Sequence, residues 1–461
     1  MTNILLFQRE LRISDNALIE KAVALNSNFI PVFIFDEKYL SGIKNKESKQ
    51  VNFLVSAVVE LKNELNAEGS ELFVFYGDKN NILKNLIKVL NCETIICGKT
   101  YEKDVNELYD GLSKLCKIDE VSDSFFSDFD IVKGNGEAFK VFTPYKNEFL
   151  KNIKKFSKSF PHGKVKFPKI NYKEFNNLLQ KFGFIKDVSV ENILKTIKFK
   201  KSDLGEFDVK SGQNKIDDFC KNRAKNYDVD RDFPSVDGTS KLSPYLRYGV
   251  VSPKRCFEEC FKHSGIRGVN TWLWELIWRE FYATTLFHFP EIQNHEFIKK
   301  YEKIKWKYDK DKLNAWKDGK TGYPIIDAGM RQLKETGWMH NRVRMVVASF
   351  LTKNLLIDWR EGEKHFANYL IDYELASNVG GWQWSASVGI DPQPYFRIFN
   401  PYLQSKKFDK NGEYIKKYVP ELASIDATTL HKDINIEGYV KQIVNYSKSR
   451  VYAIAEFKKI K

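Results

Sequence analysis

Aromatic and charged side chains share one face of a predicted helix in the segment TWLWELIWREFYATT. They fall at positions i, i+3, i+6, i+7 and i+10 and are Trp272, Glu275, Trp278, Arg279 and Tyr282. This face is too polar for a core and too aromatic for a water-facing surface. It suits a site that stacks on a flat ligand and hydrogen bonds to the ligand's edge. An Arg–Glu pair at the border of a core is the alternative.

A second predicted helix, in the segment WMHNRVRMVVASFL, brings Asn341, Arg344 and Met345 to one face, with Arg342 to the side. Methionine at this spacing more often fills a core than contacts a ligand. The two neighbouring arginines favour a site, because a core of this kind would not need them.

The segment ELASNVGGWQWSAS contains the adjacent glycines Gly380 and Gly381, followed by two tryptophans. Without side chains, this backbone can pass close to a planar ligand. Just upstream, Asp372 and Glu374 have two interpretations. Their carboxylates can accept hydrogen bonds from ribose hydroxyls, or they can cap a helix.

The segment RDFPSVDGTSKLSPYLRYG offers hydroxyl groups and free backbone N–H groups beside a helix start. Thr239, Ser240 and Ser243 are the hydroxyl donors. Such a loop can hold a phosphate. Ser and Thr also serve as ordinary N-caps, so this motif alone is a weak indication.

Few residues suggest a metal or a disulfide scaffold. Six cysteines are too few for a disulfide framework in a chain of 461 residues. Cys256, Cys260 and His263 lack a fourth ligand and the usual zinc spacing, so helix packing is favoured and no metal is predicted.

The elements that must position these residues change in type along the chain. Apolar runs at residues 4–7, 29–35, 72–76 and 94–97 alternate with helical patterns at 50–65 and 81–90, which predicts a parallel, right-handed α/β sheet. No Gly-x-Gly-x-x-Gly motif follows the first strand. The pattern then loosens into a lysine-rich stretch and becomes helical beyond Gly205. We predict three parts: an α/β domain (1–130), a connector (131–204) and an all-helical domain (205–461).

Charge and tryptophan are unevenly distributed. Residues 1–120 carry a net charge of −3, and residues 121–461 carry +17. All nine tryptophans lie between Trp272 and Trp384. The C-terminal two thirds is therefore the expected binding surface for a polyanion. No leader and no run of 18 apolar residues is visible, which predicts a cytoplasmic protein with no membrane contact.

Several motifs in a fixed order resemble the photolyase/cryptochrome family nearly end to end. They are FQRELRISDNALIEKA, PVFIFD, GTSKLSPYL, WELIWREFY, TGYPIIDAGMRQL, GWMHNRVRM, DWREGE, GGWQWSAS and PYFRIFNP. The resemblance implies a Rossmann-like α/β antenna domain and a helical domain that holds FAD in a bent conformation. The residues it implies for FAD are Tyr227, Thr239, Ser240, Lys241, Leu242, Ser243, Trp272, Arg279, Arg344, Asp372, Glu374 and Asn378.

Within the family, single residues indicate the branch. His340 is followed by Asn341, not by the second histidine typical of (6-4) photolyases, and Trp384 stands where the DASH branch usually has tyrosine. The chain therefore resembles a class I cyclobutane pyrimidine dimer photolyase. In that reaction, light-excited reduced FAD passes an electron to a flipped-out dimer and splits it. A blue-light receptor of the cryptochrome type, without repair activity, is the alternative.

The resemblance also implies roles in the reaction. Glu275 and Asn378 would act at the dimer and the flavin, and Trp382, Trp359 and Trp306 would carry an electron from the surface. Ultraviolet-damaged DNA is the implied partner of a monomer, which would associate with the nucleoid when bound. The residues implied for DNA and dimer are Arg231, Glu275, Trp278, Tyr282, Asn341, Arg342, Met345, Trp384, Arg397 and Lys406.

The segment YEKDVNELYD resembles the part of the family that holds an antenna chromophore. Asn106 and Glu107 match its pair for methenyltetrahydrofolate, which we favour. The partnering lysine is replaced near Gln293, so a deazaflavin, a flavin or no antenna remain open. Departures elsewhere include Gln8 where arginine is common and Glu374 where aspartate is usual.

Overall fold

Five parallel strands form one sheet in the order β3-β2-β1-β4-β5. The computed structural model describes residues 2–25, 28–157 and 179–460. The strands are β1 (Asn3–Phe7), β2 (Phe29–Asp36), β3 (Phe73–Gly77), β4 (Thr94–Gly98) and β5 (Lys117–Val121). The first four were predicted. The sequence of β5, KIDEV, has no apolar run to reveal it, because this strand is partly exposed.

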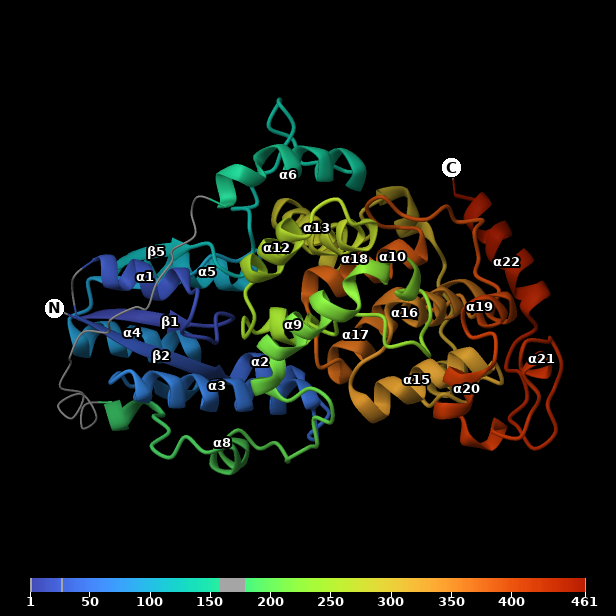
Figure 1. Ribbon diagram of the computed structural model, residues 1–461, viewed down its shortest axis with the longest axis horizontal. Coiled ribbons are helices and arrows are strands. Elements are labelled where there is room, and N and C mark those ends of the chain that lie inside the picture. Colours follow the sequence, from blue (N-terminus) through green and yellow to red (C-terminus); the bar gives the residue numbers. More distant parts are fainter. Residues whose placement is uncertain (1, 26–27, 158–178, 461) are drawn as a thin grey trace.

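Helices cover both faces of the sheet, as expected for a doubly wound α/β fold (Figure 1). Alternate strand residues point to opposite faces, so Leu5 and Phe7 lie in one core cluster while Ile4 and Leu6 lie in another. The first cluster includes α1 (Ala17–Ala24) and α3 (Lys49–Ala67), and the second includes α4 (Lys79–Leu90) and α5 (Lys103–Leu112). A short helix, α2 (Glu37–Gly42), follows β2.

The connector contains a helix that the sequence pattern did not predict, α6 (Phe142–Ser157). It packs on the helical domain: the Phe142 ring stacks on Trp278 with centroids 3.8 Å apart, and the hydroxyls of Tyr145 and Thr284 are 3.0 Å apart. Residues 158–178, which hold most of the lysine-rich stretch, lie outside the described residues. The connector continues through η1 (Gln180–Phe182) and α8 (Val190–Thr196).

The rest of the chain is helical, as predicted. Its centre is α13 (Arg267–His288), which contacts α18 (Leu375–Ala386). Around them lie η2 (Val209–Ser211), α9 (Gly212–Asn222), η3 (Ala224–Asn226), α10 (Tyr227–Asp230), α11 (Ser243–Arg247), α12 (Pro253–Lys262), η4 (Pro290–Gln293), η5 (Lys299–Lys303), α14 (Lys310–Lys317), α15 (Pro324–Thr336), α16 (Asn341–Ser349), η6 (Phe350–Asn354), α17 (Trp359–Tyr369), α19 (Pro401–Phe408), α20 (Glu413–Tyr418), η7 (Pro420–Leu422), α21 (Ala427–Leu430) and α22 (Tyr446–Lys458).

No described helix combines the length and the hydropathy needed to cross a bilayer.

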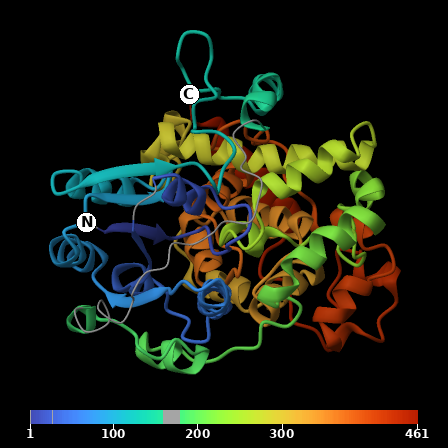
Figure 2. The same cartoon turned by 60° about the vertical axis from the view of Figure 1, so that its left-hand side comes forward.

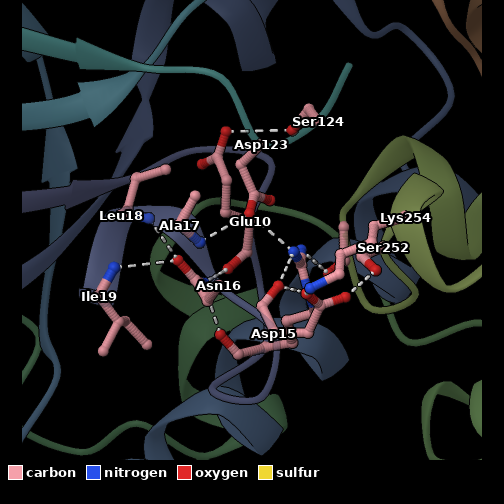
Figure 3. A network of polar contacts seen from close by, with 12 residues as sticks. Glu10, Asp15, Asn16, Ala17, Leu18, Ile19, Asp123, Ser124, Ser252 and Lys254 are labelled. Carbon is pink, nitrogen blue, oxygen red and sulfur yellow. Dashed lines mark hydrogen bonds and ion pairs between the residues drawn. The ribbon is translucent and has the colours of Figure 1, made fainter. Parts of the chain in front are cut away.

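The loop after β1 joins the sheet to the helical domain, which lies beside it in both views (Figures 1 and 2). Its backbone approaches that domain closely, since the Leu11 N–H donates to the Tyr248 carbonyl at 3.0 Å. Arg12 Nη1 donates to the Gly249 carbonyl at 2.9 Å. Asp15 pairs with Lys254 of α12 at 2.9 Å and also accepts from Ser252 (Figure 3). The segment FQRELRISDN therefore makes several polar contacts with the helical domain.

Candidate functional site

A cavity of about 510 Å³ opens among α10, α11, α13, α16 and α18. Its size is in the range of small-molecule sites. It brings together most of the residues singled out in the sequence. The predicted residues in its lining are Tyr227, Arg231, Thr239, Ser240, Lys241, Leu242, Ser243, Trp272, Glu275, Trp278, Arg279, Tyr282, Asn341, Arg344, Met345, Asp372, Glu374, Asn378, Trp382 and Trp384.

The predicted face of α13 forms one wall of this cavity. Trp272 is buried edge-on against Phe219, with ring centroids 4.9 Å apart. The charged residues on this face do not pair with each other, because Glu275 Oε1 accepts from Arg231 Nη1 at 2.6 Å while Arg279 turns to Glu374. The alternative of an Arg–Glu pair within the helix is therefore wrong.

Glu275 is held against Arg231 in a half-buried position, with 32% of its side chain exposed. Burial raises the pKa of its carboxyl group above the ordinary value, and the charge of Arg231 opposes that rise. The ion pair leaves Glu275 available at the wall of the cavity. A carboxyl group in this setting can accept or donate a hydrogen bond at the edge of a ligand.

Asp372 and Glu374 also line the cavity, just before α18. Glu374 occupies the N-cap position of α18, but its side chain makes no capping bond, so the capping interpretation is wrong for this residue. Asp372 Oδ2 accepts from Arg344 at 2.8 Å and from Ser243 at 2.6 Å. Its other oxygen, Oδ1, is buried and has no partner among the described residues.

The carboxylate of Glu374 has partners from both domains. Arg9 Nη1 donates to its Oε1 at 2.7 Å, the Tyr101 hydroxyl donates to the same oxygen, and Arg279 Nη2 donates to Oε2 at 3.2 Å. Burial alone would raise the pKa of Glu374, but Arg9, Arg247 and Arg279 together lower it to about 2. Glu374 is therefore an ionised group in the wall of the cavity.

The loop 238–243 borders the same cavity, as its motif suggested. Lys241 adopts a left-handed backbone conformation with φ of 51°. Its ammonium group pairs with Glu206 at 2.7 Å and with Asp237 at 3.1 Å, and it remains in the lining. The loop thus supplies hydroxyl groups and a partly neutralised cation to one end of the cavity.

The glycine pair of α18 has two different surroundings. A Cβ atom at Gly380 would overlap the ring of Tyr282, whereas one at Gly381 would meet no atom within 4 Å. Gly380 therefore permits the packing of α18 on α13, and Gly381 leaves open space in the cavity. Beside them, Asn378 Nδ2 donates to Glu363 Oε1 at 3.0 Å, which fixes its amide.

Some predicted site residues lie outside the cavity lining. Trp359 is fully buried behind it, and its Nε1–H donates to Glu296 at 3.4 Å. Arg342 pairs with Asp232 at 2.6 Å. The others are Trp306, Arg397, Lys406, Asn106 and Glu107; Trp306 is half-buried, and Arg397, Lys406 and Glu107 are exposed.

The segments that hold the three tryptophans predicted to carry an electron contact one another. Trp382 lies in the cavity wall, and a Cβ atom at Gly362 of α17 would overlap its ring. Trp359 begins α17. The residue after Trp306, Lys307, donates its N–H to the Leu356 carbonyl at 2.7 Å, close to the start of that helix.

The sequence reasoning missed several residues of the site. Arg9 and Tyr101 reach Glu374 from the sheet domain, and nothing in their local pattern indicates this. Trp338 belongs to a buried core cluster and also lines the cavity, and Trp274 is 39% exposed with Lys146 over its ring. The other lining residues not predicted are Leu246, Arg247, Leu276, Met339, Phe366, Leu370, Ser377 and Ser385.

Comparison with known proteins explains this arrangement. Residues 3–165 match the family described as DNA photolyase, and residues 272–459 match the FAD binding domain of DNA photolyase. A deoxyribodipyrimidine photo-lyase of Alkalihalophilus pseudofirmus is 34% identical over 483 residues, which cover 98% of this chain and 97% of the relative. The chain belongs to the DNA photolyase family.

Two solved photolyases have the same fold as this family member. A class III photolyase from Agrobacterium tumefaciens is 31% identical, with a TM-score of 0.85 over 100% of this chain and 98% of its own. An archaeal photolyase from Sulfolobus tokodaii, solved with two FAD molecules, is 30% identical, with a TM-score of 0.83 over 100% of both chains. The α/β domain followed by a helical domain, predicted from the sequence, is thereby confirmed.

The lining of the cavity fits the FAD that this family's helical domain binds. Asp372 Oδ1 and Trp382 Nε1 are buried without a partner among the described residues, so each would gain a hydrogen bond from a polar ligand. Open space beside Gly381 admits a planar group. Aromatic and aliphatic side chains make up much of the remaining wall. The residues present therefore suit a flat, polar-edged cofactor.

Proposed function

We propose that this photolyase family member repairs cyclobutane pyrimidine dimers in DNA in a light-dependent reaction and belongs to the class I branch. The observation that carries the proposal is the convergence of Glu275, Trp278, Asn341 and Trp384 on one cavity with the residues expected to hold FAD. The adjacent residues His340 and Asn341 favour a dimer substrate over a (6-4) photoproduct.

We assign the FAD-holding residues to two walls of the cavity. Thr239, Ser240, Lys241, Leu242 and Ser243, with Tyr227, would bind the phosphates and the ribityl chain through hydroxyl and backbone N–H groups. Trp272, Arg279 and Arg344 would contact the cofactor. Asp372 and Glu374 would lie beside the isoalloxazine and the ribose, and Asn378 would face flavin N5. When bound, FAD supplies light absorption and the transfer of one electron.

The lesion would enter from the DNA strand at the open side of the cavity. Photolyases are among the base-flipping enzymes, for which extrusion of a damaged, poorly paired base costs a few kcal/mol. Trp278 and Trp384 would stack on the flipped bases, and each base–aromatic contact contributes about 1–3 kcal/mol. Tyr282 and Met345 would complete the pocket.

Glu275 and Asn341 would hydrogen bond to the edge of the dimer. Glu275 is already oriented by Arg231, so little rearrangement is needed when charge develops on the substrate. Arg342, Arg397 and Lys406 would contact the DNA around the lesion. Trp382, Trp359 and Trp306 would relay an electron between the surface and the cavity. The active species would be a cytoplasmic monomer that associates with the nucleoid through DNA.

We further propose an antenna chromophore bound near α5, with methenyltetrahydrofolate favoured. Asn106 Nδ2 donates to the Thr100 carbonyl at 3.3 Å, and Glu107 lies 3.7 Å from Lys103. Asn106 is partly exposed and Glu107 is exposed, which supports contact with a ligand at the surface. The second FAD of the Sulfolobus tokodaii photolyase makes a flavin the main competitor. Chromophore extraction and absorption spectroscopy of the purified protein would identify the pigment.

Repair of a defined substrate tests the proposed function. Purified protein with reduced FAD is mixed with ultraviolet-treated oligothymidylate and exposed to blue light, and recovery of thymine absorbance is followed. Recovery in the light but not in the dark is expected. FAD binding without any light-dependent recovery would contradict repair and favour the cryptochrome-type receptor, and absence of FAD would contradict the assignment of the cavity.

A further inference from the structure

Arg9 is the second residue after β1, at the point where the strand order of the sheet reverses. In open α/β sheets this point commonly forms a crevice for ligands. In this protein, buried side chains of the chain itself lie at that point. Arg9 is 8% exposed, its Nη2 donates to the Tyr101 hydroxyl at 3.2 Å and pairs with Glu102, and its Nη1 reaches Glu374 of the helical domain at 2.7 Å.

Through this contact, the positive charge of Arg9 in the sheet domain lies next to a residue that lines the cavity of the helical domain. Glu374 is 6% exposed and lines the cavity. Two of the three groups that donate to its carboxylate, Arg9 and Tyr101, come from the sheet domain. A buried carboxylate that loses one cationic partner keeps its desolvation cost and loses the compensation. The charge balance and the hydrogen bonding of Glu374 in the cavity wall therefore depend on residues outside the helical domain.

We propose that Arg9 is a positioning residue for the flavin site, which fixes the Glu374 carboxylate and balances its charge beside the cofactor. This inference rests on FAD occupying the cavity, as proposed above. Arg9 would contact no cofactor atom itself. It would act through Glu374, whose orientation and charge the flavin would sense.

The net charge beside the cofactor predicts how removal of Arg9 would change the midpoint potential and the binding of FAD. Without Arg9, the wall gains one net negative charge, which disfavours the addition of electrons to a nearby flavin. The midpoint potential of bound FAD should therefore fall, and the binding of FAD should weaken because Glu374 is no longer held. Removal of the Glu374 charge as well should bring the potential back towards that of the original protein.

Four variants of the FAD-loaded protein test this chain of effects. They are Arg9→Gln, Glu374→Gln, the double variant, and Arg12→Gln as the matched control. Arg12 is also a buried arginine of this loop and also bonds the helical domain, but its partners are Asp123 and the Gly249 carbonyl. The readouts are the FAD dissociation constant by fluorescence titration and the midpoint potential by spectroelectrochemistry.

Arg9→Gln is expected to weaken FAD binding at least about tenfold and to lower the potential, while Arg12→Gln leaves both unchanged. The double variant should have a higher potential than Arg9→Gln. Equal values for Arg9→Gln and Arg12→Gln, or no rise in the double variant, would overturn the inference. Lack of FAD binding by the unmodified protein would instead overturn the proposed function.

Arg9→Lys covers the case in which Arg9→Gln does not fold. It keeps the charge but cannot bond Glu374, Tyr101 and Glu102 together, because an ammonium group lacks the planar fork. We expect weaker FAD binding with a nearly unchanged potential. Unchanged FAD affinity in Arg9→Lys would overturn the positioning role.

Discussion

At the scale of residues, two of the three acidic groups that line the cavity, Glu275 and Glu374, have different partners. Among the described residues, Glu275 pairs with one cation, Arg231, and burial raises the pKa of its carboxyl group. Glu374 is surrounded by several cations, and its pKa is held at about 2. Both carboxyl groups were identified in the sequence, but the difference between them comes entirely from their neighbours. One suits interaction with a substrate, and the other suits a fixed charge.

Substitution of Glu275 tests the first of these roles. Glu275→Gln is expected to lower light-driven repair about tenfold, because a hydrogen bond to a charged group contributes about 1.5–3 kcal/mol. Repair is measured as thymine recovery per photon absorbed. The control is Glu280→Gln on the same helix, since Glu280 accepts from the Phe126 and Ser127 N–H groups away from the cavity. Equal loss in both variants would contradict a role at the dimer.

The low pKa of Glu374 predicts a defined dependence of stability on pH. In the folded protein, the pKa of Glu374 lies below its ordinary value of 4.5. The stability that the ionised carboxylate contributes is therefore complete above about pH 4.5 and is lost as the pH falls towards 2. The difference in unfolding free energy between the unmodified protein and Glu374→Gln should shrink by about 1 kcal/mol between pH 7 and pH 3.5. Urea unfolding at both pH values measures it, and a constant difference would disagree with the ion pairs.

At the scale of elements, the cavity depends on how closely α18 approaches α13. Gly380 allows the approach, because the ring of Tyr282 occupies the place of a side chain. Gly381, one residue along, faces open space. Two adjacent glycines thus serve two different purposes, one in helix packing and one in the shape of the cavity.

Alanine at each glycine separates these purposes. Gly380→Ala should lower the unfolding free energy by about 1–3 kcal/mol through overpacking. Gly381→Ala should leave stability unchanged or slightly raised, since alanine favours helices, but should weaken FAD binding because its methyl group enters the cavity. Thermal unfolding of the FAD-free protein and FAD titration measure the two effects. Destabilisation of similar size in both variants would contradict this assignment.

At the scale of the whole molecule, charge and structure are divided between the domains. The first 120 residues carry a net charge of −3, and the remainder carries +17. The α/β sheet lies beside the helical domain, and the loop after β1 joins them (Figures 1 and 3). DNA is therefore expected to bind to the helical domain. The sheet domain contacts the cavity lining through Arg9 and Tyr101, which bond to Glu374.

The dependence of DNA binding on salt tests this division. Binding should weaken steeply with salt, because each phosphate contact releases counterions and adds about −0.9 to the slope of log K against log salt for duplex DNA. Arg397→Gln and Lys406→Gln should each reduce the slope by about one unit. Lys84→Gln, in α4 of the sheet domain, is the control and should leave it unchanged. Slopes that respond equally to all three would contradict binding by the helical domain.

The sequence by itself determined the elements and most of the cavity lining. Periodicity revealed the strands and helices because burial on one face imposes a spacing of two or of about 3.6 residues. It missed α6, whose amphipathic pattern lies within a segment rich in lysine, and β5, which has no continuous apolar run. Motif order indicated the family, since several long segments rarely occur together by chance.

Only the tertiary structure decided which groups pair and which tryptophans are exposed. Arg9 and Glu374 are 365 residues apart, and no local pattern relates them. Spacing did not reveal that Trp338 lines the cavity or that Trp274 is partly exposed, because exposure depends on which helix packs against each face. The ionisation of the carboxyl groups also depends on tertiary contacts. The pKa of a carboxyl group is set by burial and by nearby charges, and both arise when distant segments fold together.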